Sequence, residues 1–160
     1  MPAKLNYDFE EYFNLELLDG YGITETSTMV TMNWSGKERN MGSCGLPLPG
    51  MTVRIVNGND LDVKPGEEGE LICRGPNVMI GYHKKENETD KILKNGWYYT
   101  GDLAKQDLNG FITITGRLKE IIIRGGQNIS PTEVEEAILK NPKILDCAVV
   151  GLKHSELGEI

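Results

Sequence analysis

The chain has 160 residues, with 17 basic and 24 acidic side chains and a formal net charge of −7 at neutral pH. Because it has no excess of Lys and Arg to neutralise phosphates, the composition argues against a nucleic-acid binder or a protein that binds anionic membranes. No apolar run approaches the roughly 18 residues of an integral membrane segment. Cys44, Cys73 and Cys147 lie far apart, which indicates neither a disulfide framework nor a zinc site and favours a reduced, cytoplasmic protein.

The N-terminal part of the chain predicts a short helix followed by a strand. Phe9, Tyr12 and Phe13 fall at i, i+3 and i+4, which is the spacing of a one-sided helical stripe. The leucine-rich stretch 15–18 then predicts a short buried strand, and residues 19–25 form a turn that contains two glycines.

The middle of the chain, about residues 42–116, predicts a twisted, barrel-like sheet built from hairpins. Strands are expected at 51–56, 70–74, 97–104 and 111–115, and one short helix at 86–94. Turn signals such as Asn57-Gly58, Gly75-Pro76 and Asn109-Gly110 separate these strands.

After Gly116 the pattern becomes that of a small α+β domain. A strand over 118–124, a helix that begins at Ser130-Pro131 and a second strand over 144–150 are expected. Ser130 stands at the N-cap position, with Pro at the first helical position and Glu three residues after the cap. Two strands and one helix cannot cover their apolar faces well, so we expect a truncated piece of a larger protein with a domain boundary near 116–119.

Four clusters of residues carry groups that suit nucleotide chemistry. They are Gly20-Tyr21-Gly22-Ile23-Thr24-Glu25-Thr26, Tyr99-Thr100-Gly101-Asp102-Leu103, Gly116-Arg117-Leu118-Lys119-Glu120 and Gly125-Gly126-Gln127-Asn128-Ile129-Ser130-Pro131-Thr132-Glu133-Val134-Glu135. The Asp102 carboxylate can accept two hydrogen bonds side by side, which fits the vicinal diol of a ribose. Thr24 offers a hydroxyl donor for a phosphate and Glu25 an oxygen ligand for Mg²⁺, while the Arg117 guanidinium could reach a ribose or a phosphate.

Each of these groups also has a plain structural interpretation. Asp102 can simply make a turn, and the pair Thr24-Glu25 can cap a helix. Gly20 and Gly22 can serve a turn that needs positive φ, and Arg117 can be a solvated surface residue.

Together the four clusters, with Gly42-Ser43-Cys44-Gly45-Leu46-Pro47 between them, resemble the adenylate-forming superfamily. This superfamily includes acyl-CoA synthetases, the adenylation domains of peptide synthetases and firefly-type luciferases. The resemblance implies a mixed α/β fold. Residues 1–116 would be the β-rich, barrel-like C-terminal part of the large AMP-binding domain, and residues 117–160 the first half of the small α+β C-terminal domain.

The resemblance also implies roles for individual residues. Thr24 would contact the α-phosphate and Glu25 would bind Mg²⁺, which makes both candidate catalytic residues. Tyr21 would pack on adenine, and Gly20 and Gly22 would line the same base pocket through their backbone.

The remaining motif residues would complete the nucleotide site and the CoA site. Asp102 would hold the ribose hydroxyls and Arg117 would contact the ribose or phosphate. Lys119 would be the hinge about which the small domain rotates. Arg124, Gly125 and Gly126 would border the tunnel for the pantetheine arm of CoA. The two glycines could equally form a tight strand-to-helix turn, and Arg124 could meet a phosphate or only solvent.

The implied parent enzyme is an ATP-dependent carboxylate–CoA ligase, which adenylates a carboxylic acid and transfers the acyl group to CoA. ATP, AMP, Mg²⁺ and CoA would be its substrates and cofactors, with no nucleic-acid partner. The family's phosphate loop and its C-terminal catalytic Lys do not occur in the sequence, so the isolated chain is expected to be inactive. Two alternatives remain open: an adenylation domain that loads a carrier protein, and a truncated, non-catalytic binding module.

Overall fold

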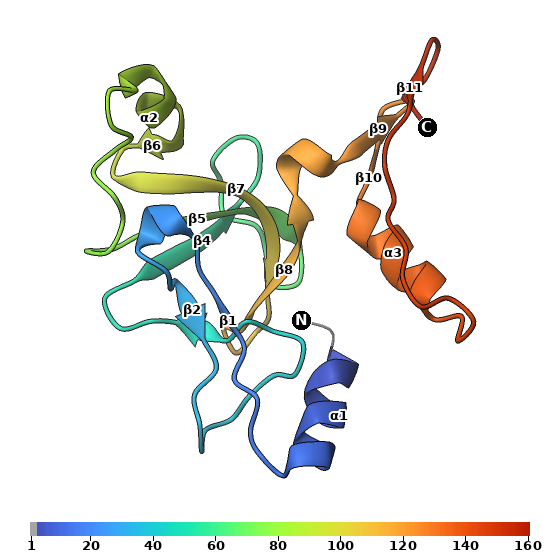
Figure 1. The fold of residues 1–160 in the computed structure, drawn as a ribbon. Coiled ribbons are helices and arrows are strands. Elements are labelled where there is room, and N and C mark those ends of the chain that lie inside the picture. Colours follow the sequence, from blue (N-terminus) through green and yellow to red (C-terminus); the bar gives the residue numbers. More distant parts are fainter. Residues whose placement is uncertain (1–2) are drawn as a thin grey trace. The chain divides into compact units, whose positions relative to one another are not determined.

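The computed structural model describes residues 3–160 (Figure 1). It shows short helices, and short strands that form three antiparallel sheets. The chain divides into two compact units. The first unit comprises the residues up to Thr100 together with Ala104–Ile114, and the second comprises Gly101–Leu103 with Thr115–Ile160. The assignment of 1–116 and 117–160 to two domains of a larger enzyme stays a prediction.

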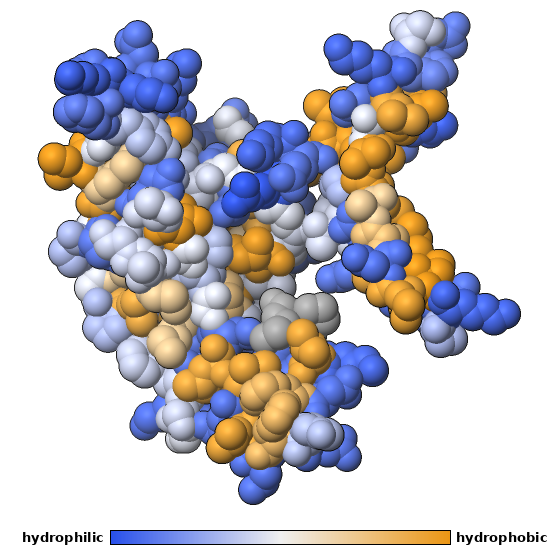
Figure 2. Space-filling model, in the orientation of Figure 1, coloured by the Kyte–Doolittle hydropathy of each residue, from blue (hydrophilic) through white to orange (hydrophobic). Residues whose placement is uncertain are grey.

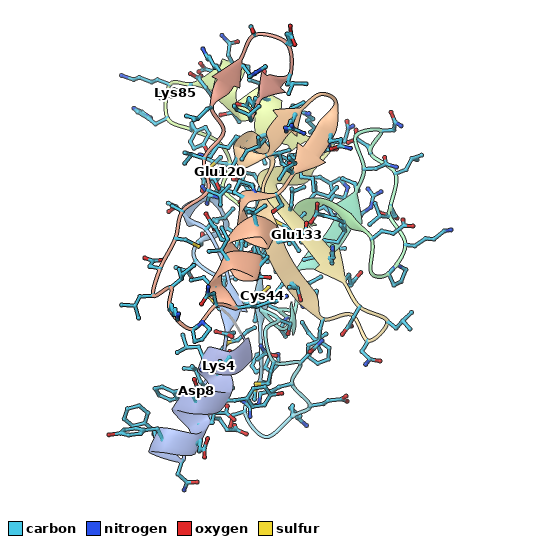
Figure 3. The ribbon with its side chains drawn as sticks, turned by 90° about the vertical axis from the view of Figure 1, so that its right-hand side faces the viewer. Lys4, Asp8, Cys44, Lys85, Glu120 and Glu133 are labelled. Carbon is cyan, nitrogen blue, oxygen red and sulfur yellow. The ribbon has the colours of Figure 1, made fainter. Side chains whose placement is uncertain are left out.

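The first unit begins with helix α1 (Ala3–Phe13), as the aromatic spacing predicts. The face of α1 that contacts the rest of the unit is polar: buried Asn6 donates to Asp19 (3.0 Å), and Glu10 forms an ion pair with Arg39 (2.6 Å). The apolar face of α1 is exposed, with Phe13 53% accessible (Figure 2). On the same helix, Lys4 and Asp8 form a solvent-exposed pair one turn apart (Figure 3).

The predicted strand over 15–18 is wrong. Leu15 is 63% exposed, and the stretch joins no sheet. Side chains satisfy its backbone instead: the Leu17 N–H donates to Glu10 Oε1 (2.9 Å), and Arg39 Nη1 donates to the Leu17 carbonyl (3.3 Å). A segment whose backbone groups find side-chain partners does not need a neighbouring strand.

Two sheets build the body of the first unit. The smaller contains β1 (Gly20–Tyr21), β2 (Thr31–Met32) and β3 (Leu46–Pro47), in the order β1-β2-β3. The larger has the order β4-β5-β7-β6, formed by β4 (Thr52–Val56), β5 (Glu68–Arg74), β7 (Trp97–Gln106) and β6 (Leu93–Lys94), and β8 (Ile112–Arg117) pairs with β7. Helix α2 (Glu86–Ile92) precedes β6. The four predicted strands are therefore confirmed, with β7 longer than expected. The helix predicted over 86–94 is confirmed up to Ile92, but its last two residues form β6 instead, because they pair with β7.

The core of the first unit comes from alternate residues of these strands. In the register of β4 and β5, Ile55 faces Leu71 and Val53 faces Cys73. The buried members of the cluster are Val30, Cys44, Ile55, Leu71, Cys73, Tyr98, Ala104 and Ile112. The members of this cluster alternate along β4 and β5, as the pleat of a strand requires. The residues next to them, Val56 and Ile72, are buried as well, so these strands are covered on both faces. The prediction of a mixed α/β fold with a curled sheet is confirmed (Figure 1).

In the second unit, β8 is followed by a single 3-10 turn, η2 (Leu118–Glu120), and then by β9 (Ile122–Arg124) and β10 (Gln127–Ile129). Helix α3 (Pro131–Leu139) and the short strands β11 (Lys153–His154) and β12 (Gly158–Glu159) follow. The sheet order is β10-β9-β12-β11. The predicted strand over 118–124 is therefore wrong in its first half, because the backbone turns before the strand begins.

The start of α3 is confirmed, with Pro131 at its first position and Glu133 in its first turn (Figure 3). The Ser130 side chain, however, makes no capping bond and donates instead to the Thr115 carbonyl (3.3 Å). Tertiary contact thus displaces the local cap that the sequence predicts.

The predicted strand over 144–150 is also wrong, since this stretch belongs to none of the sheets. It runs beside α3 (Figure 1), where Glu135 takes the place of a strand partner. The Val149 N–H donates to Glu135 Oε1 (2.8 Å), and the Cys147 thiol lies 3.6 Å from the Glu135 carbonyl. Among residues 3–160, no helix has both the length and the apolar character needed to cross a bilayer.

Candidate functional site

In the first unit, the predicted phosphate-binding residues lie on a single 3-10 turn, η1 (Thr24–Thr26), between β1 and β2. Buried Thr26 fixes this turn: its hydroxyl donates to the Ile23 carbonyl (3.0 Å) and accepts from the Ile23 N–H (3.3 Å). Thr24 is exposed and Glu25 is partly exposed. Both side chains therefore extend from a backbone that is held in place locally.

Tyr21 precedes this turn and is partly buried against the apolar core of the first unit. The glycines on either side of it do not have positive φ, so the turn-based interpretation of Gly20 and Gly22 is wrong. Space is the reason instead. An added Cβ would lie 1.2 Å from the Thr28 carbonyl oxygen at Gly22, and 2.3 Å from Met29 Cε at Gly20.

The structure adds one residue that the sequence patterns do not reveal. The Tyr82 hydroxyl donates to Glu25 Oε1 at 2.6 Å. This hydrogen bond to a carboxylate, with partial burial, raises the pKa of Tyr82 to about 12. The two residues are 57 positions apart, and no local periodicity or motif connects them.

Glu25 supplies one carboxylate, and Mg²⁺ is commonly held by one or two carboxylates together with the phosphates of a substrate. The donor set of the turn, one partly exposed carboxylate and the exposed hydroxyl of the preceding residue Thr24, therefore fits a Mg²⁺–phosphate group.

In the second unit, the structure brings Asp102 and Arg117 together. The Asp102 side chain is 6% exposed, and its Oδ1 lies 3.0 Å from Arg117 Nε, whose side chain is 49% exposed. The view of Arg117 as a merely solvated residue is therefore wrong, because part of its guanidinium pairs with a buried carboxylate. The pair fixes the direction of Asp102 and leaves much of the guanidinium accessible.

The other predicted residues of the second unit lie in or next to turns. Lys119 is exposed within η2, and Arg124 is exposed at the end of β9. Gly125 and Gly126, with φ of +57° and +85°, form the two-residue turn between β9 and β10. This is a hairpin turn rather than the predicted strand-to-helix turn, and two successive positive φ values explain why glycine occupies both positions.

Comparison with known proteins gives the family. Residues 1–83 match the family model described as AMP-binding enzyme. The chain belongs to the AMP-binding enzyme family. The predicted resemblance to adenylate-forming enzymes is thereby confirmed.

The relatives of this AMP-binding family member include bacterial CoA ligases. It is 41% identical over 143 residues to a long-chain-fatty-acid–CoA ligase of Escherichia coli O157:H7, covering 89% of this chain and 26% of that protein. It is 43% identical over 161 residues to a medium-chain fatty-acid–CoA ligase of Escherichia coli K12, covering 99% and 28%. The chain thus spans about a quarter of the length of these relatives.

Solved structures agree with this assignment. ATP-bound MatB from Rhodopseudomonas palustris matches with a TM-score of 0.92 and 33% identity over 99% of this chain and 32% of that one. A Bacillus subtilis o-succinylbenzoate CoA synthetase in complex with ATP and magnesium matches with a TM-score of 0.85 and 31% identity, covering 100% of this chain and 33% of that one.

Proposed function

We propose that the protein containing this chain is an ATP-dependent acid–thiol ligase that converts a carboxylic acid into its CoA thioester. The observation that carries this proposal is the fixed η1 turn, which carries Thr24 and Glu25 at successive positions of one short segment. The CoA ligases among its relatives support the same reaction class.

The reaction would have two steps. A carboxylate oxygen of the acid attacks the α-phosphorus of ATP, forming an acyl-adenylate and releasing pyrophosphate. The sulfur of CoA then attacks the acyl carbon, and AMP leaves with the former carboxylate oxygen as part of its phosphate. Adenylation is needed because AMP is a much better leaving group than the oxygen of a free carboxylate.

Two groups of the first unit would act on the phosphates. Thr24 would donate to an α-phosphate oxygen, and Glu25 would hold Mg²⁺, which supplies positive charge to the phosphates as charge develops during transfer. Tyr21 would pack on the adenine, and the backbone of Gly20 and Gly22 would line the same pocket.

The second unit would act on the ribose and on CoA. Asp102, oriented by Arg117, would accept hydrogen bonds from the ribose hydroxyls. Lys119 would be the hinge, and Arg124 with Gly125 and Gly126 would border the pantetheine arm of CoA. In this proposal residues 1–116 belong to the large domain and 117–160 to the small one of a cytoplasmic enzyme.

The test uses the complete protein, ATP and 2′,3′-dideoxy-ATP. Asp102→Asn should weaken ATP binding, measured by calorimetry, by about tenfold or more, because hydrogen bonds to a charged group contribute about 1.5–3 kcal/mol. It should leave the affinity for the dideoxy nucleotide unchanged. Asp90→Asn, at an exposed position in α2, is the matched control and should change neither affinity.

Thioester formation from a panel of carboxylic acids, ATP and free CoA tests the activity itself. Transfer to free CoA would exclude a strictly carrier-loading domain. Absence of both AMP and thioester across the panel would overturn the proposed function.

A further inference from the structure

A loop after β5, residues 77–82, holds the backbone around η1 in the first unit. Asn77 Nδ2 donates to the carbonyls of Thr26 and Met29, both at 2.8 Å. In return the Ser27 hydroxyl donates to the Asn77 carbonyl at 2.9 Å. These bonds join segments about 50 positions apart, so the position of the turn depends on this loop.

The same loop holds Glu25 at two points. The Met79 N–H donates to the Glu25 carbonyl (2.8 Å), and the Tyr82 hydroxyl donates to its carboxylate Oε1 (2.6 Å). Tyr82 is itself anchored, because its backbone N–H donates to Thr89 Oγ1 of α2 (2.9 Å). The orientation of the Glu25 carboxylate therefore depends on a chain of contacts that runs back to α2.

From this geometry we infer that Tyr82 is a positioning residue for Glu25, one that fixes the carboxylate so that Oε2 meets a divalent cation held by a nucleotide phosphate. This inference rests on the proposed function. A carboxylate free to rotate would have to be ordered on binding, which costs free energy, whereas a carboxylate already oriented binds the cation more tightly.

The chemistry of the pair suits this role. The phenol is a neutral donor, so it orients Glu25 without adding a positive charge that would compete with the cation. The 2.6 Å hydrogen bond occupies Oε1 of Glu25 and leaves Oε2 for another partner. Tyr82 is 37% exposed, so a change there does not open the core.

The test compares the complete wild-type protein with Tyr82→Phe, which removes only the hydroxyl. The probe is Mn²⁺ as a substitute for Mg²⁺, titrated into the protein with saturating ATP and followed by electron paramagnetic resonance. Tyr82→Phe should weaken Mn²⁺ binding by about tenfold, the effect of one hydrogen bond to a charged group. Steady-state kinetics should show a higher requirement for Mg²⁺ while the KM for the carboxylic acid is unchanged.

Two further variants make the result specific. Tyr7→Phe, at a tyrosine of α1 that is 58% exposed, is the matched control and should leave Mn²⁺ affinity at the wild-type value. Glu25→Gln removes the charge that holds the cation. Adding Tyr82→Phe to Glu25→Gln should therefore have no further effect on the remaining affinity.

Wild-type Mn²⁺ affinity in Tyr82→Phe, or additive effects of the two substitutions, would overturn the positioning role. Neither result would contradict the proposed ligase activity, because thioester formation by the wild-type protein tests that proposal separately. Absence of Mn²⁺ binding by wild type in the presence of ATP would overturn both the inference and the assignment of Glu25.

Discussion

The close packing around Gly22 predicts that the substitution Gly22→Ala destabilises the protein. The added methyl carbon would lie 1.2 Å from the Thr28 carbonyl oxygen and 2.7 Å from Met29 Cα. Ordinary contact begins near 3.4 Å, so the first distance is more than 2 Å too short. Both neighbours are backbone atoms, so no side-chain rotation can relieve the clash.

The size of the destabilisation depends on how firmly the backbone opposite Gly22, just before β2, is held. The Val30 N–H donates to the Tyr21 carbonyl (2.8 Å), and the Asn77 side chain holds the Met29 carbonyl (2.8 Å). Overpacking that neighbours can accommodate costs about 1–3 kcal/mol. Because this backbone cannot yield by 2 Å without losing such bonds, we expect Gly22→Ala to lower the free energy of unfolding by about 3 kcal/mol or more. That is a large part of the roughly 5–15 kcal/mol of a typical domain.

The assay is urea unfolding followed by circular dichroism, with Gly58→Ala as the matched control. Gly58 lies in a turn with no atom within 4 Å of its added Cβ and no left-handed φ. Gly58→Ala should therefore leave the unfolding free energy unchanged or raise it by up to about 1 kcal/mol. A Gly22→Ala protein within about 1 kcal/mol of wild type, with the same dependence on urea, would refute the packing argument.

Two further predictions concern titratable groups. Burial raises the pKa of Cys73 to about 12, and a thiol reacts only as the thiolate. In the native protein at neutral pH, a disulfide reagent should therefore label the partly exposed Cys147 and leave Cys73 intact until the protein unfolds. Prompt labelling of Cys73, located by mass spectrometry, would contradict its burial. Hydrogen bonds from Arg39 and the Leu17 N–H lower the pKa of Glu10 below its ordinary value of 4.5, so the stability they add is present above that value and lost as the pH falls through the lowered pKa. Arg39→Met should weaken this acid dependence in a thermal-melting series, and an unchanged pH profile would show that the pair does not anchor α1.

Local signals along the sequence correctly predict much of the first unit. Alternating apolar residues bounded by turn signals predict β4 and β5, which the structure confirms in one antiparallel register. The pair Ser130-Pro131 predicts the start of α3 correctly, because proline at the first helical position needs no hydrogen-bond partner for its nitrogen. The errors at 15–18 and 144–150 share one cause. Whether an apolar stretch becomes a strand depends on a partner strand, and in both places side chains of Glu10 or Glu135 take the backbone bonds instead.

The sequence by itself determined the family, through the order and spacing of four short motifs, and it determined which residue types are available for nucleotide chemistry. Only the tertiary structure decided why Gly22 must be glycine, that Asp102 pairs with Arg117, and that Tyr82 holds Glu25. The physical reason is the distance along the chain over which each kind of interaction acts. Turn propensities and apolar periodicities act between neighbours in the chain, whereas these three contacts join residues brought together only when the sheets and loops fold.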